Sequence, residues 1–400
     1  MEPVFFARRA APLSPALPAA AAPGSIAFDS GHASPAVLPD LTAEAEVALT
    51  RCRAEALQYG PRPGLPELRR WIAEFMQQDG ASVNSENVLI TNGAKHALEL
   101  VCRALVDEGD SVIVTAPTYF SAIPILRSYG ATFVEVEQDR DGMNVDALAL
   151  LLDRRAREGR PRPKFLYDVP DFHNPTGVTV PLARRASLLA LAAQHRIPIV
   201  EDSPYRKVRF EGASVPSLAS LDDDNVVIHL GTFAKLMAPG LRVGWVAAHP
   251  ALVARMAQLK TDAGSSPLAQ RIVLEFCVNG RLPSHIRDVQ RQYRENRDRM
   301  VAAMHRVLPE LFFDVPSGGY YLWASCPEDV NGDDLAAQAR QAGVIVIAGS
   351  RFYASADASH PRNRIRLAYS HALPDEIEEG VSRLARAFGT IAPRRHAAVI

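Results

Sequence analysis

The sequence has few cysteines, no long apolar run and no block of charge of one sign, and each absence excludes a class of protein. Without a Cys-x-x-Cys pair, neither a zinc site nor a disulfide framework is indicated for the four scattered cysteines, Cys52, Cys102, Cys277 and Cys326. No apolar run approaches the roughly 20 residues that span a bilayer. The net charge of −1 gives no support for a basic face that binds nucleic acid or a membrane surface. We therefore expect a cytoplasmic protein with reduced thiols, no metal, no nucleic-acid partner and no membrane partner.

Residues 1–24 imitate a signal peptide but lack its continuous apolar segment. Arg8 and Arg9 precede an Ala- and Pro-rich stretch over 10–23, in which prolines interrupt the apolar run. We interpret 1–24 as a flexible N-terminal arm. The chain of 400 residues suits a large domain with a smaller one, and 48% apolar residues suffice for a sizeable core.

Between residues 87 and 246, apolar β-branched runs alternate with helical patterns. This alternation predicts an α/β fold with a mostly parallel seven-stranded sheet covered on both faces. Ligands of such sheets bind beyond the carboxyl ends of the strands. The expected strands are 88–91, 111–115, 132–136, 164–169, 197–202, 226–230 and 241–248, and the expected helices between them are 92–101, 119–129, 145–158 and 184–195.

The flanking segments predict a smaller α+β domain. Helices are expected over 41–56, 67–77, 251–259 and 267–308, the last one interrupted near Gly280. Paired strands are expected at 312–315 and 320–323, further strands at 344–347 and 364–369, and a last helix through Ile377, Val381, Leu384 and Phe388. We assign 25–50 to the N-terminal part of the small domain, 51–265 to the large domain, and 266–400 to the C-terminal small domain, interdomain helix included.

Lys235 lies between the apolar runs 226–230 and 241–248, which we expect to be buried strands. A lysine in this position is unusual, because an ammonium is almost never buried without a partner. Taken alone, it would be a solvated loop lysine. However, it follows Thr232 at the spacing Thr-x-x-Lys and precedes the sequence Pro-Gly-x-Arg-x-Gly, in which the arginine is Arg242.

Asp202 is a second charged residue in an apolar setting, because it ends an apolar strand in Glu-Asp-Ser-Pro-Tyr205. A buried aspartate is costly unless it is paired, although a cap or turn aspartate is the commoner case.

Two further segments carry polar groups suited to an anionic ligand. Gly93-Ala94-Lys95 begins a helix after a strand, and the amides at a helix N-terminus favour anions. Lys95 either adds charge there or is simply solvated. On the strand 364–369, Arg366 alternates with apolar neighbours and faces away from them, either as an anion site or as an exposed strand arginine. Arg364 shares that strand face and is a less favoured competitor.

These motifs, together with Asn174 in Asn-Pro-Thr-Gly, resemble in identity and order those of fold-type I pyridoxal phosphate (PLP) enzymes. The resemblance is to the class I/II aminotransferases, in particular the 2-aminoadipate, kynurenine and aromatic group, and it extends over about 26 to 390. It implies PLP as cofactor and transfer of an amino group between an L-amino acid and a 2-oxo acid by ping-pong chemistry. Asn-Pro-Thr-Gly alone could be a plain turn.

The resemblance also implies a role for each residue. Lys235 would bind PLP covalently and then act as general base, Asp202 would pair with the ring nitrogen, and Tyr205 and Asn174 would hold the ring oxygen. Tyr119 would stack on the ring, and Tyr59 would reach the phosphate from the neighbouring subunit of a homodimer. The phosphate would be held by Gly93, Ala94, Lys95, Thr232 and Arg242, and the substrate by Arg366, Asn174 and Gly31.

The sequence leaves the substrate and the reaction type partly open. Ser30-Gly31-His32 stands where the family often has two glycines, and Asp29 and His32 either address a polar or basic substrate side chain or cap the loop. The same scaffold also supports oxidases, racemases and lyases. A more remote alternative is a PLP-sensing transcription regulator, which needs a DNA-binding helical domain before residue 26.

Overall fold

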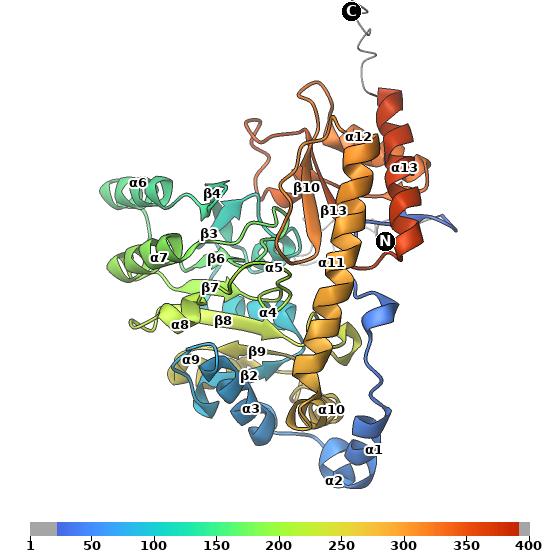
Figure 1. Cartoon of the computed structure of the whole chain (residues 1–400). Helices are drawn as coiled ribbons and strands as arrows, with labels where there is room; N and C mark the ends of the chain where they lie inside the picture. Colours follow the sequence, from blue (N-terminus) through green and yellow to red (C-terminus); the bar gives the residue numbers. More distant parts are fainter. Residues whose placement is uncertain (1–21, 392–400) are drawn as a thin grey trace, which may run out of the picture.

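The computed structural model describes residues 22–391, so most of the expected arm 1–24 lies outside the described residues. A central sheet has the strand order β2-β9-β8-β7-β6-β3-β4-β5 (Figure 1). Its strands are β2 Val88–Thr91, β3 Ser111–Ala116, β4 Thr132–Asp139, β5 Gly142–Met143, β6 Leu166–Asp168, β7 Ile199–Asp202, β8 Val227–Thr232 and β9 Gly244–Ala247. Seven of them match the expected sheet. The eighth, β5, is a two-residue edge strand, which forms because Gly142 at φ 95° turns the chain back onto β4.

The strands from β4 to β8 in this order run parallel, and β9 is antiparallel to both β8 and β2. Because successive side chains of a strand point to opposite faces, the sheet buries two separate apolar layers. One layer contains Val112, Tyr167, Val200 and Ile228, and the other contains the residue next to each of these, Ile113, Leu166, Ile199 and Val227. A sheet buried on both faces is typical of parallel α/β proteins.

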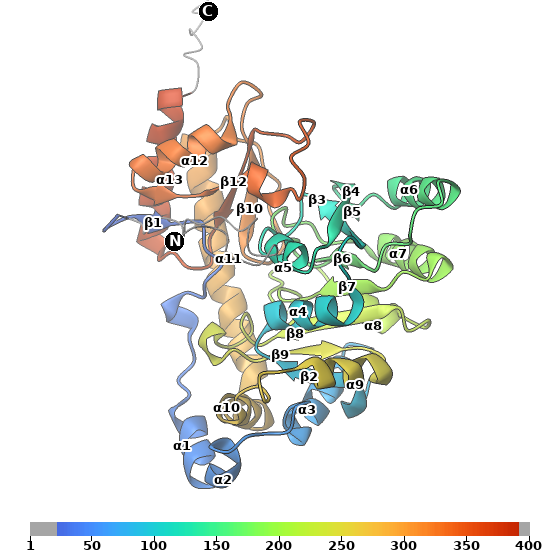
Figure 2. The same cartoon turned by 180° about the vertical axis from the view of Figure 1, so that it is seen from behind.

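Helices cover both faces of this sheet. The first layer packs against α4 Ala94–Leu105, α5 Ala122–Ser128 and α9 Pro250–Leu259, and α4 lies in front of the strands in Figure 2. The second packs against α6 Val145–Arg157, α7 Leu182–His195 and α8 Leu218–Leu221. The carboxyl ends of the parallel strands are thus left open at one edge of the sheet, where the candidate site lies.

A second group of elements lies above that edge in Figure 1. Its antiparallel sheet has the order β10-β13-β12, and the short strands β1 and β11 pair in parallel beside it. The long helix α11 runs from the large sheet to this group. The elements are β1 Ile26–Ala27, β10 Tyr321–Ser325, β11 Val344–Ile345, β12 Ile347–Ala348, β13 Arg364–Ala368, α11 Arg281–Val307, α12 Gly332–Gln341 and α13 Pro374–Ile391.

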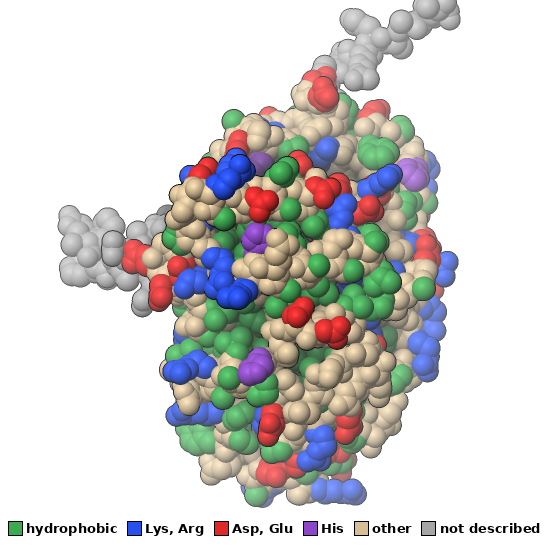
Figure 3. Space-filling model, turned by 90° about the vertical axis from the view of Figure 1, so that its left-hand side faces the viewer, with side chains coloured by type: hydrophobic (Ala, Val, Ile, Leu, Met, Phe, Trp, Pro, Cys, Tyr) green, Lys and Arg blue, Asp and Glu red, His purple; other side chains and the backbone are tan. Residues whose placement is uncertain are grey.

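The remaining helices connect these parts. They are α1 Thr42–Thr50, α2 Arg53–Ala56, α3 Pro66–Gln77 and α10 Pro267–Val278, with the 3-10 turns η3 Pro35–Val37, η4 Ser85–Asn87, η5 Pro239–Leu241 and η6 Gly349–Phe352. The expected single helix 41–56 is therefore broken after Thr50. Among residues 22–391, no helix has both the length and the apolar character needed to cross a membrane. On the face shown in Figure 3, basic and acidic side chains are interspersed.

The expected pairing of strands 312–315 and 320–323 is wrong. Phe312 forms only an isolated bridge with Ser325, and β10 pairs with β13 instead. The intervening turn is held by another part of the chain, because Phe210 N–H donates to Ser317 O at 2.8 Å and Gly319 N–H donates to Val208 O at 2.9 Å. These long-range hydrogen bonds replace the local hairpin.

Candidate active site

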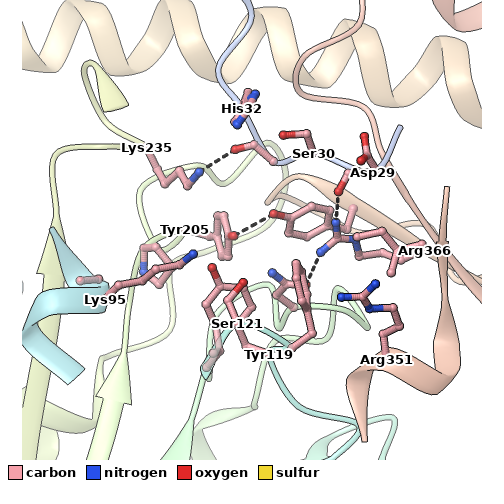
Figure 4. A pocket seen from close by; sticks show the side chains of 18 of the residues that line it. Asp29, Ser30, His32, Lys95, Tyr119, Ser121, Tyr205, Lys235, Arg351 and Arg366 are labelled. Carbon is pink, nitrogen blue, oxygen red and sulfur yellow. Dashed lines mark hydrogen bonds between the residues drawn. The ribbon is translucent and has the colours of Figure 1, made fainter. Parts of the chain in front are cut away.

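A cavity of about 900 Å³ lies between the carboxyl ends of the central strands and the second group of elements. It is lined by the loop 29–32, the start of α4, the ends of β7 and β8, and residues from α12, β12 and η6. Side chains from both sides point into it (Figure 4). The expected site residues that line it are Gly31, Ala94, Lys95, Tyr119, Asn174, Asp202, Tyr205, Thr232, Lys235, Arg242 and Arg366.

Lys235 presents its amine to the cavity from the loop between β8 and η5. Phe233, Leu236 and Met237 are buried around it, so the backbone of this loop is anchored on both sides of the lysine. The Nζ atom donates to Gly31 O at 2.6 Å. Burial, together with the nearby cations led by Lys95, lowers the pKa of Lys235 from 10.5 to about 8. About a tenth of this amine is therefore neutral and nucleophilic at pH 7, far more than of a lysine with its ordinary pKa.

Asp202 ends β7 and is only 5% exposed. Tyr167 on the adjacent strand β6 donates its hydroxyl proton to Asp202 Oδ2 at 2.7 Å. The other oxygen, Oδ1, is buried without a hydrogen-bond partner among the described residues. Burial raises the pKa of Asp202 to about 6, and the Tyr167 hydrogen bond opposes that rise. Because an unpaired buried carboxylate oxygen is costly, this geometry fits a cationic N–H donor in the cavity, such as a protonated pyridine nitrogen.

Arg366 is 1% exposed and stands on β13 at the cavity wall. Its Nη1 donates to Asn174 Oδ1 at 2.9 Å, and its Nη2 donates to the backbone oxygen of Asp29. The guanidinium lies 4.1 Å from the ring centroid of Tyr321, whose hydroxyl is 3.1 Å from that of Tyr205. Arg366 Nε and Asn174 Nδ2 are buried without partners among the described residues, so donors remain for a ligand.

The start of α4 and Arg242 form a cationic end of the cavity. Gly93 is the residue before α4 and has φ 84°, and a Cβ there would lie 2.7 Å from Arg242 Nη2. Glycine is therefore needed for the close approach of the guanidinium. Burial and Arg242 lower the pKa of Lys95. Two cations beside helix amides, with Thr232 nearby at the end of β8, fit a phosphate dianion.

Of the remaining expected residues, Tyr119 and Gly31 line the cavity and Tyr59 does not. Tyr119 points into the cavity (Figure 4), where burial raises the pKa of its hydroxyl. A Cβ on Gly31 would collide with the Tyr321 hydroxyl, so this close approach requires glycine. Tyr59 is 83% exposed and does not line the cavity. The structure of the single chain therefore does not bring Tyr59 into its own site.

Several cavity-associated residues were not identified from the sequence. Tyr167 supports Asp202, and Tyr321 and Phe120 both lie against the guanidinium of Arg366. Arg351 lines the cavity beside Phe120. Tyr167 carried a usable signal, because a hydroxyl within a buried apolar strand needs a partner. Arg351 carried none, since a single arginine after a Gly-Ser turn is ordinary in a surface loop.

The fold, together with this arrangement of an amine, a buried carboxylate and a cationic end of the cavity, is that of the fold-type I PLP-dependent transferases. Comparison with known families agrees, because the family model described as aminotransferase class I and II matches residues 24–384. The chain belongs to this family. It is a transaminase whose cofactor is PLP, and it moves an amino group between an L-amino acid and a 2-oxo acid.

Named relatives and solved structures are similar over nearly the whole chain. The chain is 36% identical to the 2-aminoadipate transaminase of Thermus thermophilus, over 91% of this chain and 90% of that protein. It is 34% identical to aromatic-amino-acid aminotransferase 1 of Thermococcus litoralis, over 87% of this chain and 83% of that protein. The structure of a Pyrococcus horikoshii kynurenine aminotransferase in complex with PMP has a TM-score of 0.90 at 30% identity, over 97% of each chain.

Proposed function

We propose that the cavity around Lys235 is the transaminase centre and that its residues divide the work as follows. Lys235 would hold PLP covalently through Nζ, with the carbonyl oxygen of PLP leaving as water. Asp202 Oδ1 would accept the hydrogen bond of the ring N–H, and Tyr119 would stack on the ring. Tyr205 and Asn174 hold the ring oxygen. The phosphate is held by Gly93, Ala94, Lys95, Thr232 and Arg242. The observation that carries this assignment is the buried Asp202 Oδ1, which has no partner among the described residues and borders the same cavity as Lys235.

Bound PLP supplies an electron sink for the pair of electrons that remains when the substrate Cα loses its proton. The residues of this chain position the substrate and move that proton. Arg366 holds the α-carboxylate, with Gly31 and Asn174 beside it, and so directs the Cα–H bond toward Lys235. The substrate amine would first take the place of Lys235 on the cofactor. The freed Lys235 Nζ then takes the proton from Cα, a role that suits an amine with a pKa of about 8.

We also propose that two chains form the working unit and that the enzyme is cytoplasmic. Tyr59 follows α2 and is 83% exposed, with Leu49 and Leu57 exposed nearby in sequence at 43% and 60%. Exposed large apolar side chains of this kind favour an interface. In the proposed homodimer, Tyr59 reaches the phosphate held by the partner subunit. The boundaries at 50/51 and 265/266 between large and small domains stay predictions.

Borohydride reduction tests the assignment of Lys235 directly. After exposure to PLP, reduction and proteolysis, mass spectrometry should find the phosphopyridoxyl group on the peptide containing Lys235. Lys235→Ala should abolish both this label and turnover, whereas Lys164→Ala, a surface lysine paired with Asp110, should retain both. A Lys235→Ala protein that keeps full turnover would refute the assignment.

The reaction type is tested by supplying an amino acid without a 2-oxo acid. A transaminase centre should yield one equivalent of pyridoxamine phosphate per site and then stop. Continuous oxygen consumption, inversion at Cα or continuous elimination would instead support the oxidase, racemase or lyase alternatives. The measurement is absorbance and product analysis over several site equivalents.

A further inference from the structure

Three ionisable side chains form a row across the central sheet: Asp168 of β6, Glu201 of β7 and His229 of β8. Neighbours in this row are in register, and all three side chains are buried. Successive residues of a strand point to opposite faces, so the row lies on the face opposite to that of Asp202. The proposed centre uses none of these three groups. Because buried charges are costly unless they are paired, we looked for the charge balance of the row.

Glu201 is held as a carboxylate by the groups around it. The backbone N–H groups of Leu218 and Ala219 donate to its two oxygens at 2.7 Å and 3.1 Å, and His229 Nδ1 lies 2.8 Å from Oε2. A backbone N–H can only donate, so both oxygens act as acceptors, as those of an ionised carboxylate do. Burial by itself would raise the pKa of Glu201, but the interactions with His229 and with the backbone outweigh burial and hold this pKa below its ordinary value.

His229 is the cation that balances this carboxylate. Arg185 also acts on Glu201, but its guanidinium donates to both oxygens of Asp171, at 2.9 Å and 3.3 Å. Burial raises the pKa of Asp168 to about 7, so this neighbour adds little negative charge below neutral pH. The buried anion of the row is therefore Glu201, and the imidazole in contact with it supplies the positive charge.

On its other side, His229 faces a small cavity of about 30 Å³, which has room for one water molecule. The carboxylate of Asp79 also lines this small cavity, but it is paired with Lys207 Nζ at 2.6 Å and with Arg206 Nε at 3.5 Å. Ser203 Oγ lines it too and is buried without a hydrogen-bond partner among the described residues. The imidazole therefore has a polar group and space for a water on the side away from its carboxylate partner, which lowers the cost of its charge.

Asp202 stands next to this pair, at the end of β7. Leu230 is opposite Asp202 in the register of β7 and β8, so His229 lies diagonally across from Asp202. Burial raises the pKa of Asp202 to about 6, and the charge of His229 opposes this rise. The hydrogen bond from Tyr167 and the charge of Lys235 oppose it as well. A cation at His229 therefore favours the ionised form of Asp202, which can accept a hydrogen bond from a protonated ring nitrogen.

We propose that His229 is a positioning residue of the transaminase centre, a cation held by Glu201 that keeps Asp202 ionised for the ring nitrogen of the cofactor. This inference rests on the proposed centre at Lys235. His229 does not line the cavity around Lys235, so it acts through its charge rather than by touching cofactor or substrate. Binding of the cofactor ring should therefore depend on pH in a way that changes when this one charge is removed.

The test measures the affinity of the full-length, cofactor-free protein for pyridoxamine phosphate (PMP) by calorimetric titration across a pH series. PMP carries the ring and the phosphate of PLP but an amine in place of the aldehyde, so it does not bond to Lys235. The affinity of the wild type should fall as the pH drops below about 6, where Asp202 takes up a proton. A phosphate monoester also titrates at about pH 6, so each curve is compared with that of Asp202→Asn, in which the contribution of Asp202 is absent.

His229→Gln removes the charge but keeps an amide that can donate to Glu201. The midpoint of the Asp202-dependent change in affinity should rise by roughly half a unit to one unit of pH, less than the shift of about one to three units that a charge in direct contact causes. His229→Lys, which keeps a cation at this position, should return the midpoint toward the wild-type value. The matched control is Trp245→Phe, which alters a ring 6.4 Å from that of His229 in the wall of the same small cavity and changes no charge, so the midpoint should stay as it is.

An unchanged midpoint in His229→Gln, or an equal shift in Trp245→Phe, would overturn the role of His229. Circular dichroism checks that each variant is folded, and His229→Asn, a smaller neutral variant, gives a second measurement of the shift if His229→Gln does not fold. If instead the wild type and Asp202→Asn bind PMP with the same affinity at every pH, Asp202 does not face the ring nitrogen, and the proposed function itself has failed.

Discussion

Replacing Tyr167 with phenylalanine tests how this protein keeps a carboxylate ionised inside its core. Tyr167 and Asp202 are both buried, and the hydroxyl proton of Tyr167 is donated to Asp202 Oδ2 at 2.7 Å. The substitution removes one oxygen and leaves the ring in place. Its effect on packing is therefore small, and the effect on the charge of Asp202 should dominate.

The magnitude follows from the pKa of Asp202. Because burial raises this pKa from 3.8 to about 6, the folded state binds the proton more tightly than the unfolded state does. Stability therefore falls as pH rises from about 4 to about 6, by roughly 3 kcal/mol in total. A hydrogen bond to a charged group contributes about 1.5–3 kcal/mol and a neutral one about 1 kcal/mol, so the loss of this bond should raise the pKa of Asp202 by a further half unit to one and a half units or so.

The expected signature is a pH-dependent cost of Tyr167→Phe. In cofactor-free protein at pH 8, where Asp202 is ionised, the variant should lose about 1.5–3 kcal/mol of unfolding free energy. At pH 5, where Asp202 is largely protonated, only a neutral hydrogen bond is lost, and the cost should be about 1 kcal/mol. Urea unfolding followed by circular dichroism at the two pH values measures the difference.

A double-mutant cycle tests whether the pH-dependent part of the cost of Tyr167→Phe comes from the interaction between Tyr167 and Asp202. In an Asp202→Asn background the side chain stays neutral, so the extra cost of Tyr167→Phe at pH 8 should disappear. An equal cost at pH 5 and pH 8, or a pH-dependent cost that persists in the Asp202→Asn background, would refute the view that Tyr167 stabilises the ionised carboxylate.

Two further predictions concern the cations around the phosphate end. Together with burial and other cations, the charge of Lys95 lowers the pKa of Lys235 to about 8. Lys95→Met should therefore raise the pH at which Lys235 of the cofactor-free protein becomes half-reactive toward an amine-specific reagent, and an unchanged midpoint would show that the charge of Lys95 does not contribute to that pKa. Gly93→Ala should weaken PLP binding about tenfold or more, because its Cβ would lie 2.7 Å from Arg242 Nη2 and would push the guanidinium away from the phosphate, and a hydrogen bond between charged groups contributes roughly 1.5–3 kcal/mol. Gly240→Ala, where a Cβ meets nothing within 4 Å, is the control for equilibrium titration with PLP, and equal affinities of the two variants would contradict the steric argument.

The site residues that could be predicted from the sequence are those that lie at the end of a strand, because the local sequence pattern predicts the strand and where it ends. Lys235 and Asp202 follow apolar, β-branched runs, and a charged residue directly after a buried strand of a parallel sheet lies at its ligand-binding edge. Asp202 does line the cavity from the end of β7, and Lys235 lines it from the loop after β8. Their roles toward PLP came from the family resemblance rather than from this pattern.

Contacts between residues far apart in sequence could not be predicted in the same way. Tyr167 meets Asp202 because β6 lies beside β7 in a register that places Tyr167 opposite Val200. No local pattern specifies that register. The incorrectly expected hairpin over 312–323 has the same cause, since Ser317 and Gly319 bind the backbone of a distant segment around residues 208–210. Local turn chemistry favours a hairpin there, and tertiary hydrogen bonds override it.

Burial makes the charged forms of Lys235 and Asp202 unfavourable, and it also makes the Lys235 amine reactive. Desolvation shifts the pKa of Lys235 down to about 8 and that of Asp202 up to about 6, so the two values converge on neutral pH. In the protein without cofactor, each shift records an unfavourable interaction of the charged form with its surroundings. A ligand that bonds to the amine and donates a hydrogen bond to Asp202 Oδ1 relieves both at once. Because such a ligand binds only the folded chain, it adds about 4 kcal/mol of stability at a thousand times its dissociation constant. The same desolvated environment that makes the empty site costly thus makes the amine nucleophilic and ties folding to cofactor binding.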